Sequence, residues 1–261
     1  LRLESELRRA LQQENFVLHY QPIIALDRER VVGFEALVRW QRTPQQLVFP
    51  GDFIQVLEET GLIVPLGFWI LGEACATVRR WHQRFPREQP LTISVNVSVR
   101  QFAQADFVTR VRDIIHDSGI DPSAVRLEIT ESITMGDVEH IVQVLTDLQA
   151  IGVRLSMDDF GTGYSSLSYL HRFPLDILKI DRSFVSQMDQ ASENLHIVQT
   201  IMNLANNLGM KVVAEGTETR AQIDQLKSLG CDYGQGYFFS KPLPMVAIEK
   251  LMTEQDGLSG G

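Results

Sequence analysis

The sequence predicts an α/β fold, and more narrowly a TIM-like (β/α)8 barrel. In the second half of the chain, a helical pattern ends at a glycine before a short apolar strand three times, at Gly152, Gly209 and Gly230. Connections of helix length require neighbouring strands to be parallel. About eight strands in ~240 residues suit a closed barrel better than an open sheet. The alternative, a doubly wound sheet, is disfavoured because no glycine-rich dinucleotide loop follows the first strand.

The N-terminal half is predicted to carry three strands. Leucines at helical spacing open the chain and predict an amphipathic, linker-like helix. The first strand should stop at Gln21-Pro22, where a turn is expected, and a later helix should be capped by Asp52 and ended by Gly61. In order, the expected elements are a helix over 1–14, strands over 16–20 and 31–40, helices over 52–60 and 62–85, and a strand over 91–98.

The C-terminal half alternates regularly between helices and strands, which is the pattern of successive βα units. Its glycine-rich last residues, 256–261, read as a flexible tail that follows a single domain over 1–255. The expected elements are helices over 102–118, 138–150, 165–171, 195–208 and 219–229, and strands over 125–131, 153–158, 176–181, 211–215 and 233–239.

Composition excludes several classes of partner. A net charge of −9 argues against binding to a DNA or RNA polymer, which needs a basic surface. No apolar run reaches the ~18 residues that span a bilayer, so no membrane contact by this domain is expected. Cys75 and Cys231 lack metal-ligand spacing and are expected to be free thiols in a reducing, cytoplasmic compartment. The opening helix and the missing initiator Met indicate a domain of a longer protein, in which N-terminal regulatory domains and a membrane tether are both possible.

Inside the strands, one side is apolar and the other is largely polar. Because helices must cover the apolar side, the polar side should point into the barrel. A single charged residue at a strand end is more often solvated than functional, but here five strands carry an oxygen ligand near their C-terminal ends, where barrel enzymes assemble their sites. These residues are Glu35, Asn96, Glu128, Asp158 and Glu215.

Carboxylate and amide oxygens without clustered His or Cys favour Mg²⁺ or Mn²⁺ over zinc. Asp159, directly after Asp158, adds a further carboxylate. The set is larger than one Mg²⁺ usually takes from protein, so two ions about 3.5–4 Å apart are expected.

The motifs around these residues resemble the EAL-domain family of cyclic di-GMP phosphodiesterases. The resemblance spans about residues 5–250. Thr217, where many members have Val, is a conservative departure. The matching segments are Glu35-Ala36-Leu37-Val38-Arg39, Asn96-Val97-Ser98, Glu128-Ile129-Thr130-Glu131-Ser132, the stretch over 158–167, Lys179-Ile180-Asp181, Glu215-Gly216-Thr217-Glu218 and Gln235-Gly236-Tyr237.

The resemblance implies a modified barrel whose first strand is antiparallel. It implies hydrolysis of cyclic di-GMP to linear pGpG by a water activated by two metal ions, Mg²⁺ or Mn²⁺, in bacterial second-messenger turnover. Ca²⁺ should permit substrate binding but inhibit hydrolysis. One ion would be held by Glu35, Asn96, Glu128 and Asp158, and the other by Asp158, Asp159 and Glu215.

The resemblance also implies the remaining roles. Lys179 would orient the water or transfer protons, with its pKa lowered by the nearby cations; a salt bridge to Asp181 is its structural alternative. Arg39 is a candidate phosphate or guanine contact, with stacking beside Trp40 as the alternative. The implied residues are Lys179, Glu35, Glu218 and Gln235 for catalysis, Gln21, Arg39, Leu37, Asp181 and Gly236 for substrate binding, and Glu131 for anchoring the loop over 160–164. A homodimer is expected as well.

Two rival functions use the same residues. A receptor would bind cyclic di-GMP without cutting it, but family members of that kind lose metal ligands or the lysine, and all are present here. An enolase-like enzyme would use Lys179 as a base to abstract a proton, but the adjacent aspartates and the Asn ligand argue against it. Product analysis with Mg²⁺ distinguishes the first rival, and competition by cyclic di-GMP the second.

Overall fold

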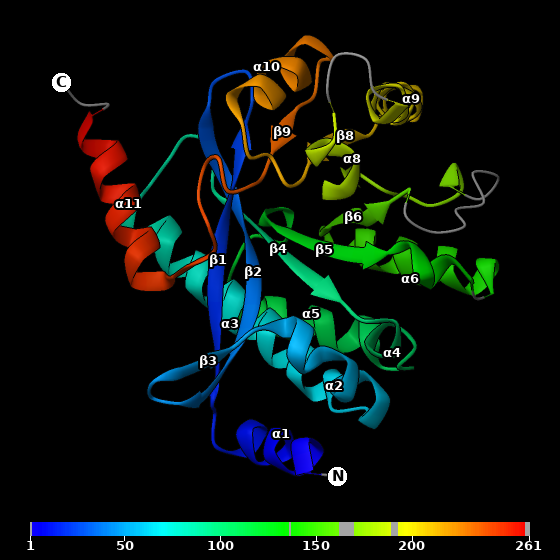
Figure 1. The fold of residues 1–261 in the computed structure, drawn as a ribbon. Helices are drawn as coiled ribbons and strands as arrows, with labels where there is room; N and C mark the ends of the chain where they lie inside the picture. Colours follow the sequence, from blue (N-terminus) through cyan, green and yellow to red (C-terminus); the bar gives the residue numbers. More distant parts are fainter. Residues whose placement is uncertain (1, 136, 162–169, 189–192, 259–261) are drawn as a thin grey trace.

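The computed structural model describes residues 2–135, 137–161, 170–188 and 193–258. Eight strands close into a barrel in the order β1-β2-β4-β5-β6-β7-β8-β9, with β9 pairing back to β1 (Figure 1). They are β1 (Phe16–Ala25), β2 (Arg30–Thr43), β4 (Thr92–Val97), β5 (Val125–Thr130), β6 (Arg154–Phe160), β7 (Ile177–Ile180), β8 (Lys211–Ala214) and β9 (Tyr233–Gly234). The predicted barrel is confirmed.

The first strand is the exception to parallel pairing. β1 is antiparallel to β2 on one side and to β9 on the other, whereas all the other neighbouring pairs of the ring, from β2 with β4 to β8 with β9, are parallel. Two short strands extend the sheet outside the ring: β3 (Gln46–Val48) pairs with β2, and β10 (Leu243–Pro244) pairs with β1. Neither short strand was predicted.

Helices surround the barrel, as βα connections require. The longer ones are α1 (Arg2–Gln12), α2 (Ile54–Thr60), α3 (Ile63–Arg84), α5 (Phe107–Ser118), α6 (Val138–Ile151), α9 (Glu193–Asn207), α10 (Arg220–Ser228) and α11 (Met245–Leu258). The shorter ones are η1 (Pro50–Asp52), α4 (Val99–Phe102), η2 (Pro122–Ala124), η3 (Glu131–Met135) and α8 (Arg182–Ser186). No helix in the described ranges is long and apolar enough to cross a membrane.

Several predicted boundaries were wrong. β1 runs straight through Pro22, whose position lies between the two short pairings of the opposite edge, at residues 19–20 and 24–25, so its missing N–H breaks no ladder there. α2 begins after Phe53, and Asp52 belongs to η1 instead of capping the helix. The helix expected from 102 starts at Phe107, after the separate α4.

At the C-terminus, α11 was missed, and residues 256–258 continue this helix where a tail was expected. β9 is much shorter than the strand predicted over 233–239. The helix predicted over 165–171 lies mainly outside the described residues.

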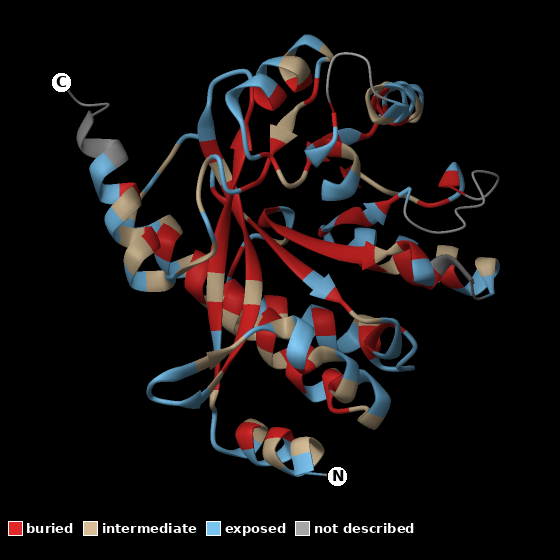
Figure 2. Cartoon of the chain, viewed as in Figure 1, coloured by how far each residue is buried: buried red, intermediate tan, exposed pale blue. Residues whose placement is uncertain are grey.

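The core fills the layer between the strands and the helices (Figure 2). Trp81 of α3 is fully buried and packs edge-on against Tyr20 of β1, with ring centroids 5.0 Å apart. Its indole N–H donates to Glu249 of α11 at 3.1 Å, which attaches the last helix to the same layer. At the other end of the chain, Leu7 of α1 is fully buried, so this helix packs on the domain.

Candidate active site

Five carboxylates from four strands, one amide from a fifth strand and one lysine meet at the C-terminal end of the parallel strands. The parity of β5 turns Glu128 inward, opposite Asn96 of β4 in the register, and the last residues of β6 bring in Asp158 and Asp159. Glu215 directly follows β8. The structure therefore brings together all six predicted metal ligands around Lys179 of β7.

Lys179 is the centre of this cluster. Its side chain is fully buried, and its Nζ lies 2.6 Å from Glu128 Oε2, 2.6 Å from Glu215 Oε1, 3.2 Å from Asp158 Oδ1 and 3.6 Å from Glu35 Oε2. The alternative salt bridge to Asp181 is wrong, because Asp181 instead caps α8 by accepting from the backbone N–H of Ser183 at 2.9 Å. The ammonium of Lys179 thus forms ion pairs with four carboxylates.

Glu35 is held by two amide groups. Asn96 Nδ2 donates to Glu35 Oε1 at 2.7 Å, and Gln235 Nε2 donates to Glu35 Oε2 at 2.6 Å. Gln235 Nε2 also donates to Gln21 Oε1 at 3.1 Å, and Gln21 in turn donates to the carbonyl of Ser240. These hydrogen bonds link β1, β2 and the segment after β9 at the C-terminal end of the barrel. Asn96 uses its amide nitrogen in the bond to Glu35, so its amide oxygen, the atom that would bind a cation, takes no part in that bond.

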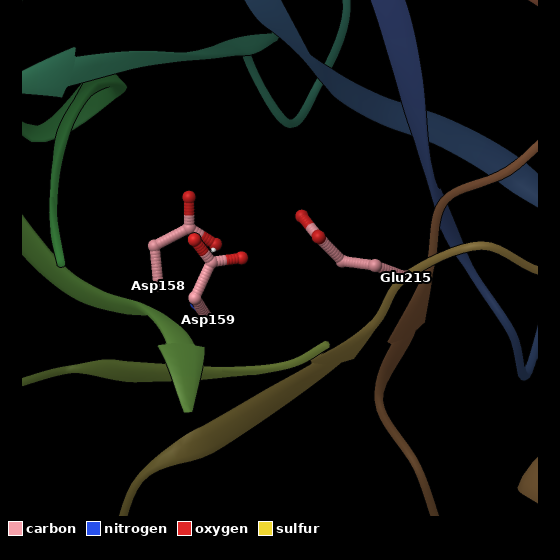
Figure 3. Close-up of side chains that lie close together, drawn as sticks. All are labelled: Asp158, Asp159 and Glu215. Atoms are coloured by element: carbon pink, nitrogen blue, oxygen red, sulfur yellow. Dashed lines mark hydrogen bonds between the residues drawn. The ribbon is translucent and has the colours of Figure 1, made fainter. Parts of the chain in front are cut away.

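Asp158, Asp159 and Glu215 form a tight acidic group. One oxygen of each lies within 4.8 Å of the others, and Figure 3 shows Glu215 pointing toward the aspartate pair. The backbone N–H of Asp159 donates to Asp158 Oδ1 at 3.0 Å. Asp159 has a φ of 52°, in the left-handed region that non-glycine residues rarely adopt, so adjacent strand residues need not face opposite ways here. The backbone turn therefore lets both aspartates serve one site.

Burial and mutual repulsion perturb the acids. Burial raises the pKa of Glu128 to about 8, because its cost for a charged carboxylate outweighs the attraction of Lys179. The pKa of Glu215 is also raised to about 8 for the same reasons. For Asp159, burial and then the charge of Asp158 raise the pKa. Burial opposes charge on Lys179, but the four carboxylates together raise its pKa well above the ordinary value.

The donor set fits divalent cations. Five carboxylates and one ammonium carry a net charge of −4 when all are ionised, which two divalent ions would neutralise. Every donor is a hard oxygen of the kind that Mg²⁺ and Mn²⁺ prefer. Burial and the neighbouring carboxylates raise the pKa values of Glu128 and Glu215, so bound cations would stabilise the ionised forms of both groups.

The residues predicted to bind substrate lie in different parts of the site. Leu37 and Arg39 follow Glu35 on the same face of β2. Arg39 is buried, donates to the carbonyl of Val38, and lies over the ring of Phe49 at 5.1 Å. The alternative of an Arg39 that stacks beside Trp40 is therefore wrong. Arg42 is the residue whose guanidinium lies over the Trp40 ring.

Other predicted residues lie around the rim. Gly236 is buried against Thr217, where an added Cβ would come within 2.2 Å of the Thr217 carbonyl oxygen. Asp181 lies near enough to Asp159 to contribute to raising its pKa. Glu218 is exposed, and its backbone N–H donates to Gln222; in the described part of the chain its carboxylate makes no bond to the cluster. Glu131 is buried, but the loop that it is expected to anchor lies mostly outside the described residues.

Two residues at this end of the barrel, Phe49 and Thr217, were not predicted to be part of the site. Phe49 precedes a Pro-Gly turn and is more than half exposed, and only the hairpin of β2 and β3 brings it to Arg39. The hydroxyl of Thr217 is fully buried and has no hydrogen-bond partner among the described residues. An exposed aromatic next to a turn was the only local signal available.

Comparisons with known proteins agree with this geometry. A model of the EAL domain matches residues 4–242. MucR of Pseudomonas aeruginosa, named a bifunctional diguanylate cyclase/cyclic di-GMP phosphodiesterase, is 43% identical over 244 residues, covering 94% of this chain and 35% of MucR. The signaling protein YkoW of Bacillus subtilis is 41% identical over 255 residues, covering 98% of this chain and 32% of YkoW. The chain thus spans about a third of the length of these curated relatives.

Solved structures share the fold. The PaMucR phosphodiesterase in its c-di-GMP complex aligns with a TM-score of 0.90 at 42% identity, covering 95% of this chain and 100% of that one. The FimX EAL domain from Pseudomonas aeruginosa bound to c-di-GMP aligns with a TM-score of 0.82 at 20% identity, covering 92% and 96%, which supports the fold alone.

Proposed function

This chain belongs to the EAL domain family, and we propose that it hydrolyses cyclic di-GMP to linear pGpG in a reaction that requires Mg²⁺ or Mn²⁺. The observation that carries the proposal is the convergence of four carboxylates on one buried lysine at the C-terminal end of the barrel, with the carboxylate of Asp159 beside two of them. The relatives named as cyclic di-GMP phosphodiesterases and the c-di-GMP complex of PaMucR support the choice of substrate.

Two divalent cations would be bound here. One would be held by Glu35, Asn96, Glu128 and Asp158, and the other by Asp158, Asp159 and Glu215. When bound, such cations polarise phosphate oxygens and lower the pKa of a coordinated water. The side chains supply the frame: Asn96 and Gln235 fix the orientation of Glu35 through bonds of 2.7 and 2.6 Å. Gln235 Oε1 is buried without a hydrogen-bond partner in the described chain, and is thus free to accept from a water.

Lys179 has two roles in this proposal. It holds the carboxylates together by charge, with its Nζ 2.6 Å from both Glu128 and Glu215, and it would orient the attacking water or take part in proton transfer. Arg39 would contact a substrate phosphate, since its Nε is buried and has no hydrogen-bond partner in the described part of the chain. Leu37, Gln21, Asp181 and Gly236 would line the substrate, and Glu218 would reach it from the rim.

The test is direct hydrolysis. Purified protein is incubated with cyclic di-GMP and Mg²⁺ or Mn²⁺, and products are identified by chromatography and mass spectrometry. We expect pGpG from the wild type, none from Lys179→Met, and wild-type rates from Glu139→Gln, a control at an exposed position on α6. Saturable binding without any product would make the chain a receptor and refute the proposed hydrolysis.

The relatives are longer than this chain, so regulation by further domains and assembly into a homodimer are also proposals. Light scattering of the purified chain with and without cyclic di-GMP measures the assembly. A monomer mass at all concentrations would reject the homodimer for this domain.

A further inference from the structure

The barrel has a second polar opening at the end opposite the carboxylates. It is a cavity of about 1450 Å³ lined by residues with which parallel strands begin, including Thr92 of β4, Arg126 of β5, Lys211 of β8 and Tyr233 of β9. Arg126 precedes Glu128 by two residues on the same inward face, which separates them by about 7 Å along the strand. The cavity is therefore distinct from the candidate active site and opens in the opposite direction.

The lining of this cavity is basic in an acidic protein. Six arginines and lysines but only four aspartates and glutamates line it, whereas the whole chain has a net charge of −9. Three of these cations pair with acids at the cavity: Arg28 with Asp27 at 3.2 Å, Lys211 with Asp232 at 2.7 Å, and Lys227 with Glu29 at 2.6 Å. These three pairs place opposite charge directly beside Arg28, Lys211 and Lys227.

Arg126 is the main exception. Its side chain is only 8% exposed, and its Nε and Nη1 are buried without a hydrogen-bond partner in the described part of the chain. The nearby acid Asp176 is already engaged, because it accepts from Arg154 at 2.7 Å and from the backbone N–H of Leu155 at 2.8 Å. The ring of Tyr233 lies 5.5 Å from the guanidinium carbon and gives it a supporting surface.

A buried cation is costly unless an anion and hydrogen bonds compensate it. Ordered water could satisfy Nε and Nη1, whereas an oxyanion would satisfy them and also place a negative charge directly on the guanidinium. A guanidinium offers a planar fork of donors that matches the paired oxygens of a phosphate group. Arg126 therefore has the burial, the unused donors and the open cavity that phosphate recognition requires.

We propose that this cavity binds a small phosphate-class oxyanion, inorganic phosphate or a phosphate monoester, on the guanidinium of Arg126. The site lies at the N-terminal ends of the strands and shares no residue with the carboxylate cluster. It is independent of the proposed hydrolysis, so either can fail without the other.

The test measures phosphate binding to protein from which metals and chelator have been removed, since metals at the other end of the barrel would capture phosphate. Calorimetry at constant ionic strength should give saturable binding to the wild type. Arg126→Gln should weaken the affinity at least tenfold. Arg8→Gln is the control, because Arg8 of α1 is an exposed arginine that lies outside the cavity and away from Arg126 and Asp176. Its affinity should equal that of the wild type.

A comparison of inorganic phosphate with phenyl phosphate distinguishes the two sources: tighter binding of the ester indicates a ligand with an organic group in the cavity. If Arg126→Gln does not fold, Arg126→Lys keeps the charge and loses the fork, and should weaken binding severalfold. Crystals soaked in selenate give a second readout, an anomalous peak within hydrogen-bond distance of Arg126. Equal affinity in wild type and Arg126 variants, no saturable binding, or selenate peaks elsewhere only would each overturn the proposal.

Discussion

The metal-free protein should become less stable as the pH rises from about 5 to about 8. Glu128 and Glu215 have pKa values raised from 4.5 to about 8 in the folded state. Between those values the folded carboxyl keeps a proton that the unfolded one has already released. Unfolding therefore releases protons in this window, and the free energy of unfolding falls as the pH increases.

The size of the effect follows from the shift. Moving one pKa from 4.5 to about 8 corresponds to ~5 kcal/mol. Because Glu128 and Glu215 share the charge of Lys179, we take the shift of one group as the scale for the pair. A loss of about 5 kcal/mol is a large part of the 5–15 kcal/mol that typically stabilises a folded protein. Mg²⁺ or Mn²⁺ binds the ionised carboxylates, so saturating metal should cancel or reverse this slope.

Urea denaturation followed by tryptophan fluorescence, in EDTA and in Mg²⁺, measures these slopes at pH 5 to 8. Glu128→Gln removes one perturbed group and should flatten the metal-free slope, whereas Glu139→Gln should leave it unchanged. His19, whose pKa is lowered by burial, contributes with the opposite sign below about pH 6.5, and is the same in all three proteins. The reasoning would be refuted if the free energy of unfolding in EDTA stayed level or increased with pH, and did so equally in the wild type and in Glu128→Gln.

Three further predictions concern the site. Asp158→Asn should lower turnover at least a thousandfold while thermal unfolding stays cooperative, because Asp158 would contact both ions; a rate close to wild type would exclude it as a ligand. Replacing Mg²⁺ by Ca²⁺ should preserve cyclic di-GMP binding in calorimetry but abolish pGpG formation, since Ca²⁺ prefers longer bonds and looser geometry; comparable turnover with both ions would contradict this. Gly236→Ala should lower the Tm by about 5–10 °C, because the new Cβ meets the Thr217 backbone, and an unchanged Tm would disprove that close contact.

Much of the fold could be predicted because its signals are local. Gly152 and Gly209 end helices in the left-handed conformation, as the sequence indicates. The alternation in β5 turns Glu128 inward and predicts that it meets ligands from other strands. For such residues, the period of the strand and the closure of the barrel are sufficient to predict a common site.

The remaining features depend on partners that are distant in the sequence. Pro22 breaks a local rule for strands and is tolerated only because the far edge of β1 has a gap in its pairing at that residue. The buried charge of Arg126 becomes evident only when its neighbours are known to be engaged elsewhere. Four carboxylates contributed by distant segments raise the pKa of Lys179 in the protein without metal ions. The lower pKa that we expect beside bound cations stays a prediction.

The pairing of the first strand with the last strand of the ring has a consequence for how the chain folds. β1 must pair with β9, so that Ile24 meets Gly234 and the two ends of the chain are joined by the sheet. During synthesis the ribosome must deliver nearly the entire domain before this seam can form. Until then, the unpaired edge of β1 is exposed to neighbouring chains and can pair with them. The risk of aggregation therefore ends only when β9 has left the ribosome and paired with β1.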